Sequence, residues 1–215
     1  MLLIFDLDDT LIPTSKEITP KKLDSALKKM IDAGLKINFE EGKKRIHQLN
    51  EKAHRSKQAI EYLVLECGGD ETHREIGLKA LEDKLLDFNV TPQKELNEFL
   101  RVLRKEYPLA IVTGGSKQVQ EEKIDLYKID RELFREIIVE DWGEKERAYI
   151  QLKERFGSFL VVGDRIANDL SGAKKLGGIT IHIRQGRGLL EPKNHPDVDY
   201  EIETIKELTR VLERV

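Results

Sequence analysis

The sequence has 215 residues, of which 39% are hydrophobic, and this is enough for one sizeable core or for one core with a small second domain. Its formal charge is −3, from 37 Lys and Arg residues against 40 Asp and Glu residues, which argues against a dedicated nucleic-acid-binding protein. No stretch approaches the roughly 20 apolar residues of a membrane span. Because Cys67 is the single cysteine and no secretory signal precedes Asp6, we expect a cytoplasmic protein without an internal disulfide.

Short apolar runs predict the strands of a parallel sheet. Residues 2–5 form a continuous apolar run, which is typical of a strand that is buried on both faces. A weaker pattern near residues 198–202 predicts an edge strand. Four further runs resemble the first, at residues 109–112, 137–139, 159–162 and 179–183.

Helical patterns separate these runs. Residues 96–103 place their apolar side chains on one face, and the pattern of residues 166–176 ends at Gly177, a typical signal for a helix C-terminus. Residues 202–212 predict a last amphipathic helix, and residues 186–188 predict a flexible turn. The alternation of strands and helices predicts an α/β fold with a parallel sheet covered on both faces.

Residues 14–90 interrupt this alternation, because their apolar residues follow helical spacing and none of them predicts a strand. Pro13 and Pro92 mark the two ends, since proline disfavours a helical conformation in the residue before it. We therefore expect a core of residues 1–13 and 91–215, with a helical domain of residues 14–90 inserted after the first strand. The helices expected in the insertion lie around residues 23–31, 46–53, 60–67 and 80–88.

Residues that could take part in chemistry follow the ends of the predicted strands, either directly or a few residues downstream. Open parallel sheets bind ligands outside the carboxyl ends of their strands, so we expect these residues to meet at one edge of the sheet. In chain order they are Asp6, Asp8, Thr113, Gly114, Lys145, Asp164 and Asp169.

This set of residues predicts a magnesium site that binds a phosphoryl group. Crowded carboxylates repel one another unless a cation neutralises them, and oxygen ligands suit Mg²⁺. The Thr113 hydroxyl and the Gly114 N–H can bind phosphoryl oxygens, and Lys145 can neutralise charge in the transition state. The Asp6 carboxylate can attack phosphorus to give an acyl phosphate. If an irregular backbone aims Asp8 at the same site, it can protonate the leaving oxygen and later activate water.

The motifs resemble those of the haloacid dehalogenase (HAD) superfamily. Asp6-Leu7-Asp8-Asp9-Thr10 resembles the first motif, Asp-x-Asp-x-Thr after an apolar strand. Thr113-Gly114 resembles the second motif, and Lys145 resembles the third. Gly163-Asp164 followed by Asn168-Asp169 resembles the fourth. The resemblance covers nearly the whole chain once the predicted sheet is included.

The resemblance implies a fold and a role for each motif residue. The core would be Rossmann-like with strand order 5-4-1-2-3, and the helical insertion would be a C1-type cap. Asp6 would be the nucleophile and a metal ligand, and Asp8 would be the general acid/base, with its backbone carbonyl on the metal. Asp164 would be a further metal ligand. Either Asp169 or Asn168 would be the second metal-site residue of the fourth motif.

One departure from the family pattern concerns the third motif. In this branch of the family the lysine is commonly followed by proline, whereas Glu146 follows Lys145. Lys117 and Lys123 are therefore alternatives. We favour Lys145 because it comes after the third strand and directly before the helix expected at residues 147–156.

These features together predict a Mg²⁺-dependent phosphatase for a small phosphorylated metabolite, without nucleic-acid or membrane partners and with an open oligomeric state. A phosphomutase would share Asp6 and Asp8 and is an alternative. Family members that cleave carbon-halogen bonds lack the second aspartate, so Asp8 argues against a dehalogenase. A non-enzymatic phospho-accepting module is also conceivable, but receiver domains place the accepting aspartate after a middle strand, whereas Asp6 follows the first.

Overall fold

The computed structural model describes residues 1–85, 88–141 and 144–215. The chain forms two compact units, which are Met1–Thr14 with Asp87–Val215 and Ser15–Leu86. We call the first the α/β unit and the second the helical unit. Among the described residues, no helix combines the length and the apolar character that crossing a membrane requires.

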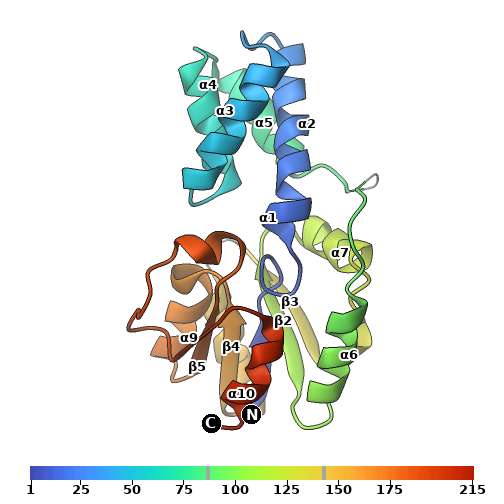
Figure 1. The fold of residues 1–215 in the computed structure, drawn as a ribbon, viewed down its shortest axis with the longest axis vertical. Coiled ribbons are helices and arrows are strands. Elements are labelled where there is room, and N and C mark those ends of the chain that lie inside the picture. Colours follow the sequence, from blue (N-terminus) through green and yellow to red (C-terminus); the bar gives the residue numbers. More distant parts are fainter. Residues whose placement is uncertain (86–87, 142–143) are drawn as a thin grey trace. The chain divides into compact units, whose positions relative to one another are not determined.

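A parallel sheet forms the centre of the α/β unit (Figure 1), and the predicted α/β fold is confirmed. In the described part of the chain it has six strands in the order β3-β2-β1-β4-β5-β6. This differs in detail from the expected order 5-4-1-2-3, because a sixth strand pairs with the outer side of β5. The strands are β1 (Leu2–Phe5), β2 (Leu109–Gly114), β3 (Glu136–Glu140), β4 (Phe159–Gly163), β5 (Ile179–Ile183) and β6 (Tyr200–Ile202).

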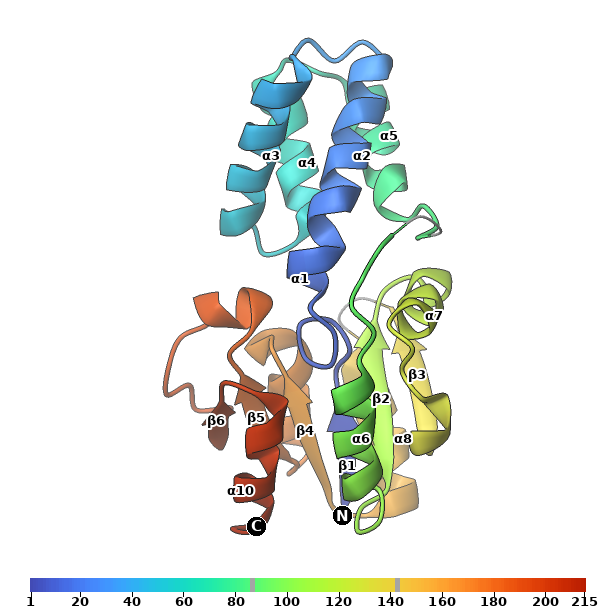
Figure 2. The same cartoon turned by 45° about the vertical axis from the view of Figure 1, so that its right-hand side comes forward.

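Helices cover both faces of this sheet. Figure 2 shows α6 (Lys94–Leu103) and α10 (Leu208–Leu212) in front of the strands and α8 (Lys145–Phe156) behind them. Ile202 lies in β6 and not in the expected last helix, since the helical segment that follows begins at Ile205, with Thr204 as its N-cap. The other helical elements of this unit are α7 (Lys117–Leu126), α9 (Ser171–Lys175), the 3-10 helices η1 (Arg131–Leu133), η3 (Gly186–Leu190) and η4 (Ile205–Glu207), and the π-helix η2 (Ile166–Leu170). The short helix α1 (Thr14–Glu17) begins at the last residue of the first segment of this unit, and its other residues belong to the helical unit.

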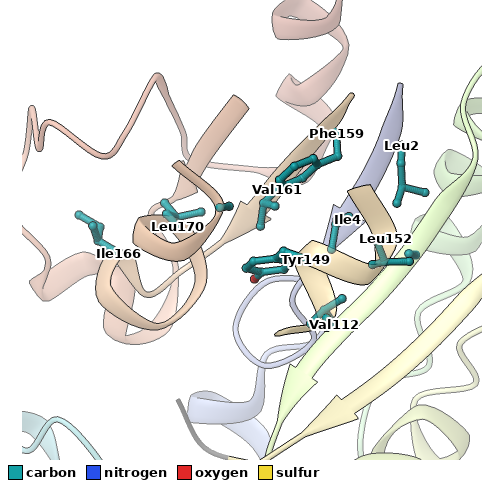
Figure 3. Close-up of a cluster of buried hydrophobic side chains, with 12 residues drawn as sticks. Leu2, Ile4, Val112, Tyr149, Leu152, Phe159, Val161, Ile166 and Leu170 are labelled. Atoms are coloured by element: carbon teal, nitrogen blue, oxygen red, sulfur yellow. The ribbon is translucent and has the colours of Figure 1, made fainter. Parts of the chain in front are cut away.

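The core behind the sheet supports the elements that carry polar residues. Alternate side chains of a strand point to opposite faces, so β1 contributes Leu2 and Ile4 to this side. They pack with Tyr149 of α8 and Leu170 of η2 (Figure 3). The start of α8 and the π-helix are thereby held by apolar packing against the central strands. The other labelled members of the cluster are Val112, Leu152, Phe159, Val161 and Ile166.

The helical unit has an apolar core of its own. Residues such as Leu27, Met30, Ile60 and Leu63 are fully buried in it. The helix expected at residues 80–88 is not found in its described part, because the helix that includes residues 80 and 81 begins earlier, where the side chain of Asp70 caps it, and ends at Leu81. Residues 86–87 of that prediction lie outside the described residues. The helices are α2 (Thr19–Asp32), α3 (Phe39–Lys52), α4 (Ser56–Glu66) and α5 (Glu71–Leu81).

Candidate active site

A tight loop after β1 carries the two aspartates of the first motif, and it is visible between β1 and α1 in Figure 2. The Asp6 N–H donates to the Val162 carbonyl at 2.9 Å, so Asp6 still lies at the end of the sheet. The carbonyl oxygen of Leu7 then lies within 3.4 Å of the N–H groups of three successive residues from Thr10 onward. Asp9 adopts a positive φ of 56°, which aspartate tolerates better than most residues. The backbone after the strand is therefore irregular.

Three buried carboxylates meet at this edge of the sheet. Asp6, Asp164 and Asp169 each place an oxygen within 4.8 Å of the others, and their exposed fractions are 5%, 4% and 2%. Burial raises the pKa of Asp6 to about 7; Lys145 opposes this rise, and repulsion from Asp169 and Asp8 adds to it. Burial, then repulsion from Asp169 and Asp6, raises the pKa of Asp164 well above its ordinary value. Such a buried set of oxygen donors fits a small divalent cation such as Mg²⁺.

Lys145 lies at the start of α8 and contacts this group. Its ammonium donates to Oδ1 of Asp6, and to Oδ1 of Asp169 at 2.7 Å. The side chain is buried, and burial alone would lower its pKa. The nearby carboxylates of Asp169 and Asp6 outweigh this effect and hold the pKa of Lys145 well above its usual value. Lys145 thus lies where the third motif was expected, as a cation buried among carboxylates.

The π-helix η2 positions the carboxylate of Asp169. The Arg165 N–H donates to Oδ2 of Asp169 at 2.9 Å, and the Tyr149 hydroxyl donates to its carbonyl oxygen at 3.0 Å. A Cβ at Gly163 would lie 2.5 Å from the Cβ of Asp169, so the close packing of these two residues requires glycine. Asn168, the alternative residue of the fourth motif, is partly exposed, whereas Asp169 is buried.

The second motif lies at the end of β2. Thr113 is 1% exposed, and its hydroxyl oxygen accepts a hydrogen bond from the side chain of Gln120 at 2.7 Å. The same amide nitrogen lies 2.9 Å from the Gly114 carbonyl oxygen and 2.9 Å from Oδ2 of Asp8, so its two hydrogens are shared among three acceptors. The sequence analysis missed Gln120, although a polar residue on the inner face of a helix directly after a motif is a usable signal.

Asp8 binds α7 rather than the three-carboxylate group. Lys123 Nζ lies 2.8 Å from both of its oxygens, and the Thr14 hydroxyl donates to Oδ1. Burial would raise the pKa of Asp8, but Lys123 and the hydrogen bonds lower it below its ordinary value. Of the two alternative lysines, Lys123 therefore contacts a motif aspartate, whereas Lys117 has a side chain that is 79% exposed. The expected contact between the Asp8 carbonyl and a metal stays a prediction.

The segment after β5 also belongs to this site. It was expected to be a flexible turn, but Gly186 begins the 3-10 helix η3 and packs on Asp9. Its φ is +49°, and a Cβ there would lie 2.2 Å from Cγ of Asp9, so the position requires glycine. Burial, then repulsion from Arg165, lowers the pKa of Arg187, against the attraction of nearby aspartates. The rule that identified the other sites, polar residues after a strand, would have found Arg187 too.

A model of the family described as haloacid dehalogenase-like hydrolase matches residues 1–177. The chain belongs to this family of hydrolases. Two relatives are named glyceraldehyde 3-phosphate phosphatase. The one from Methanopyrus kandleri is 28% identical over 97% of this chain and 95% of its own. The one from Pyrococcus furiosus is 26% identical over 99% of this chain and 93% of its own.

Solved structures share the fold. A HAD phosphatase from Thermococcus onnurineus is 25% identical with a TM-score of 0.63, covering 98% of this chain and 97% of that one. YfnB from Bacillus subtilis, crystallised with magnesium, is 19% identical with a TM-score of 0.66, covering 98% and 97% of the two chains. At 19% identity, the likeness to YfnB shows a shared fold and nothing more. The resemblance to the HAD superfamily that was inferred from the motifs is therefore confirmed.

Proposed function

We propose that the protein is a phosphatase that hydrolyses a small phosphoric monoester through an aspartyl-phosphate intermediate on Asp6, with Mg²⁺ as cofactor. The observation that carries this proposal is the buried group of Asp6, Asp164 and Asp169 with the Lys145 ammonium against it. Membership of a hydrolase family and the printed names of the curated relatives support a phosphate ester as the substrate. The name of these relatives, glyceraldehyde 3-phosphate phosphatase, supports a small metabolite.

The metal site would use the acidic residues of the first and fourth motifs. We propose that Asp6, Asp164 and Asp169 hold Mg²⁺ through their carboxylates and that Asp8 holds it through its backbone carbonyl. When bound, the cation supplies positive charge that offsets both the crowded carboxylates and the phosphoryl oxygens of the substrate. The raised pKa of Asp6, about 7, and that of Asp164 reflect burial and repulsion, which a divalent cation would relieve.

In the first chemical step, an oxygen of Asp6 attacks phosphorus. The bond between phosphorus and the ester oxygen breaks, and Asp8 gives a proton to that oxygen, which releases the alcohol and leaves an acyl phosphate on Asp6. The Thr113 hydroxyl and the Gly114 N–H bind phosphoryl oxygens. Lys145, as a buried cation beside Asp6, stabilises the negative charge that develops on the phosphoryl group.

In the second step, water attacks the phosphorus of the acyl phosphate. Asp8, now a carboxylate, takes a proton from this water as the bond between phosphorus and Asp6 breaks. The products are inorganic phosphate and the free Asp6 carboxylate. The contact with Lys123 favours the ionised form of Asp8 that this step requires.

The test is release of inorganic phosphate from p-nitrophenyl phosphate and from a panel of phosphorylated metabolites that includes glyceraldehyde 3-phosphate. We expect release with Mg²⁺, loss of release with EDTA, and recovery when Mg²⁺ is returned in excess. Transfer of the phosphoryl group to another position of the substrate, without free phosphate, would indicate a mutase instead. No release from any ester under these conditions contradicts the proposed function.

A further inference from the structure

Two buried polar side chains of α7 contact the proposed catalytic residues although neither belongs to a motif. Gln120 is 2% exposed and Lys123 is 8% exposed. They are three residues apart in the sequence, so they share one face of the helix. A lysine is seldom buried to this degree without a partner or a task. The contacts of these two side chains therefore bear on how the site works.

Gln120 links the second motif to the first. Its amide nitrogen lies 2.9 Å from Oδ2 of Asp8 and 2.9 Å from the Gly114 carbonyl oxygen. The Gly114 carbonyl, and Asp8 in its ionised form, can only accept a hydrogen bond, so the donor end of the amide must face them. The same nitrogen lies 2.7 Å from the Thr113 hydroxyl oxygen, which therefore accepts as well. The hydroxyl proton of Thr113 is thus directed away from Gln120 and is free to bind a phosphoryl oxygen.

Lys123 holds the carboxylate of Asp8 at both oxygens, at 2.8 Å each. Thr14 donates to Oδ1, and Gln120 donates to Oδ2, so each oxygen has two partners. The carboxylate cannot rotate without losing a contact to α7. The face of α7 that carries Gln120 and Lys123 therefore decides where Asp8 lies.

We propose that Gln120 and Lys123 are positioning residues, which hold the Asp8 carboxylate and turn the Thr113 hydroxyl proton towards the phosphoryl group. The inference rests on the proposed phosphatase function, because it concerns the geometry of Asp8 and Thr113 in that reaction. Asp8 follows β1 and Thr113 ends β2, so a side chain that bonds both sets the distance between the acid and the phosphate-binding hydroxyl. Neither positioning residue needs to touch the substrate.

The test compares substrates with poor and good leaving groups. An alkyl phosphate such as glycerol phosphate needs a proton on its leaving oxygen, whereas p-nitrophenolate leaves without one. Lys123→Met keeps the length of the side chain and removes its charge. We expect it to lower kcat/KM for glycerol phosphate by about 100-fold, as misplacement of a catalytic group by about 1 Å does, and to lower that for p-nitrophenyl phosphate by a much smaller factor.

Lys117→Met is the matched control for Lys123→Met. Lys117 lies on the same helix, but its side chain is 79% exposed and its nearest acidic partner, Glu121, is 3.9 Å away. We expect wild-type rates with both esters. Lys123→Arg should restore much of the activity towards glycerol phosphate, because it returns a cation to the same place.

Gln120→Met is the second variant, and it keeps the inference testable if Lys123→Met fails to fold. It replaces a neutral side chain, so the ion pair between Lys123 and Asp8 stays in place. We expect a higher KM for both esters, because the Thr113 hydroxyl loses its fixed direction, and a lower kcat for glycerol phosphate. Gln118→Met is its control, since Gln118 is exposed and contacts Glu122 at 3.0 Å.

The outcomes separate this inference from the proposed function. If the wild type hydrolyses both esters and the two buried-residue variants keep the wild-type ratio of alkyl to aryl turnover, the positioning role is overturned and the phosphatase stands. Raised turnover of glycerol phosphate in Lys123→Met would also overturn it. If the wild type releases phosphate from no ester of the panel with Mg²⁺, the proposed function fails and the positioning role fails with it.

Discussion

In the α/β unit, most of the buried polar side chains gather at one edge of the sheet, whereas the described part of the helical unit buries Lys22 alone among its charged and polar side chains. Lys22 donates to the Asp83 carbonyl within its own unit. Other ion pairs of the helical unit lie at its surface, as in Arg45 with Glu66, whose side chains are 44% and 40% exposed. Burying a charge costs free energy unless it is paired, so a fold concentrates such groups where their chemistry is used. This contrast points to the same edge of the sheet as the motifs do, without using them.

The largest effect is expected from Asp6→Asn. The amide cannot attack phosphorus, so kcat should fall by more than about 10⁴-fold, as when other enzymes lose their nucleophile. The fold should survive, because the substitution removes one of three mutually repelling carboxylates. Phosphate release and far-UV circular dichroism would measure the two effects. Asp125→Asn, at a side chain that is 70% exposed, is the matched control and should keep full activity.

Asp164→Asn should shift the response to metal. It removes a charged oxygen donor from the proposed Mg²⁺ site, so the Mg²⁺ concentration for half-maximal rate should rise about tenfold or more. A titration of phosphate release against Mg²⁺, after treatment with EDTA, measures this. An unchanged half-maximal concentration would remove Asp164 from the metal site. Asp197→Asn, at a partly exposed side chain that accepts from Ser171, is a control outside the carboxylate group.

Lys145→Met should destabilise the α/β unit. Asp6 and Asp169 would lose their buried cation, and breaking a buried pair on one side costs about 3–5 kcal/mol in the free energy of unfolding. Arg45→Met removes one partner of an exposed pair in the helical unit and should leave that free energy unchanged. Urea unfolding followed by circular dichroism compares the two variants. Equal losses would contradict the contrast between the units.

The smallest effect is expected in the apolar core of the helical unit. Ile60 is 0% exposed, and Ile60→Val removes one buried methylene, so the free energy of unfolding should fall by about 1 kcal/mol. Leu65→Ala is the control on the same helix, because Leu65 is 77% exposed. Thermal unfolding of both variants measures the difference. A loss at Leu65 as large as that at Ile60 would contradict the burial that the structure assigns to this helix.

Much of the α/β unit could be predicted from the sequence, because strands that are buried on both faces read as continuous apolar runs. Residues 179–183, for instance, were predicted with the bounds of β5. The sixth strand was visible only weakly, since β6 has three residues and includes the charged Glu201. In the described part of the helix expected at residues 80–88, the apolar spacing was misleading, because Leu85 is buried although it lies in a loop.

The gathering of motif residues could likewise be anticipated, because parallel strands end at a common edge. The environment of Asp8 could not be anticipated, since it depends on how α7 packs against the loop after β1. Lys123 and Asp8 are 115 residues apart in the sequence. Sequence reasoning considered Lys123 only as an alternative to Lys145. In the structure, Lys123 contacts Asp8, whereas Lys145 contacts Asp6 and Asp169. No local sequence pattern shows which lysine contacts which aspartate.

Trapping of the covalent intermediate tests the central claim most directly. Wild-type protein would be mixed with substrate and Mg²⁺, quenched with borohydride, which reduces an acyl phosphate to an alcohol, and mapped by peptide mass spectrometry. The account predicts conversion of Asp6 to homoserine, dependent on both substrate and Mg²⁺. Modification of a different carboxylate, or steady turnover without any modification of Asp6, would contradict it.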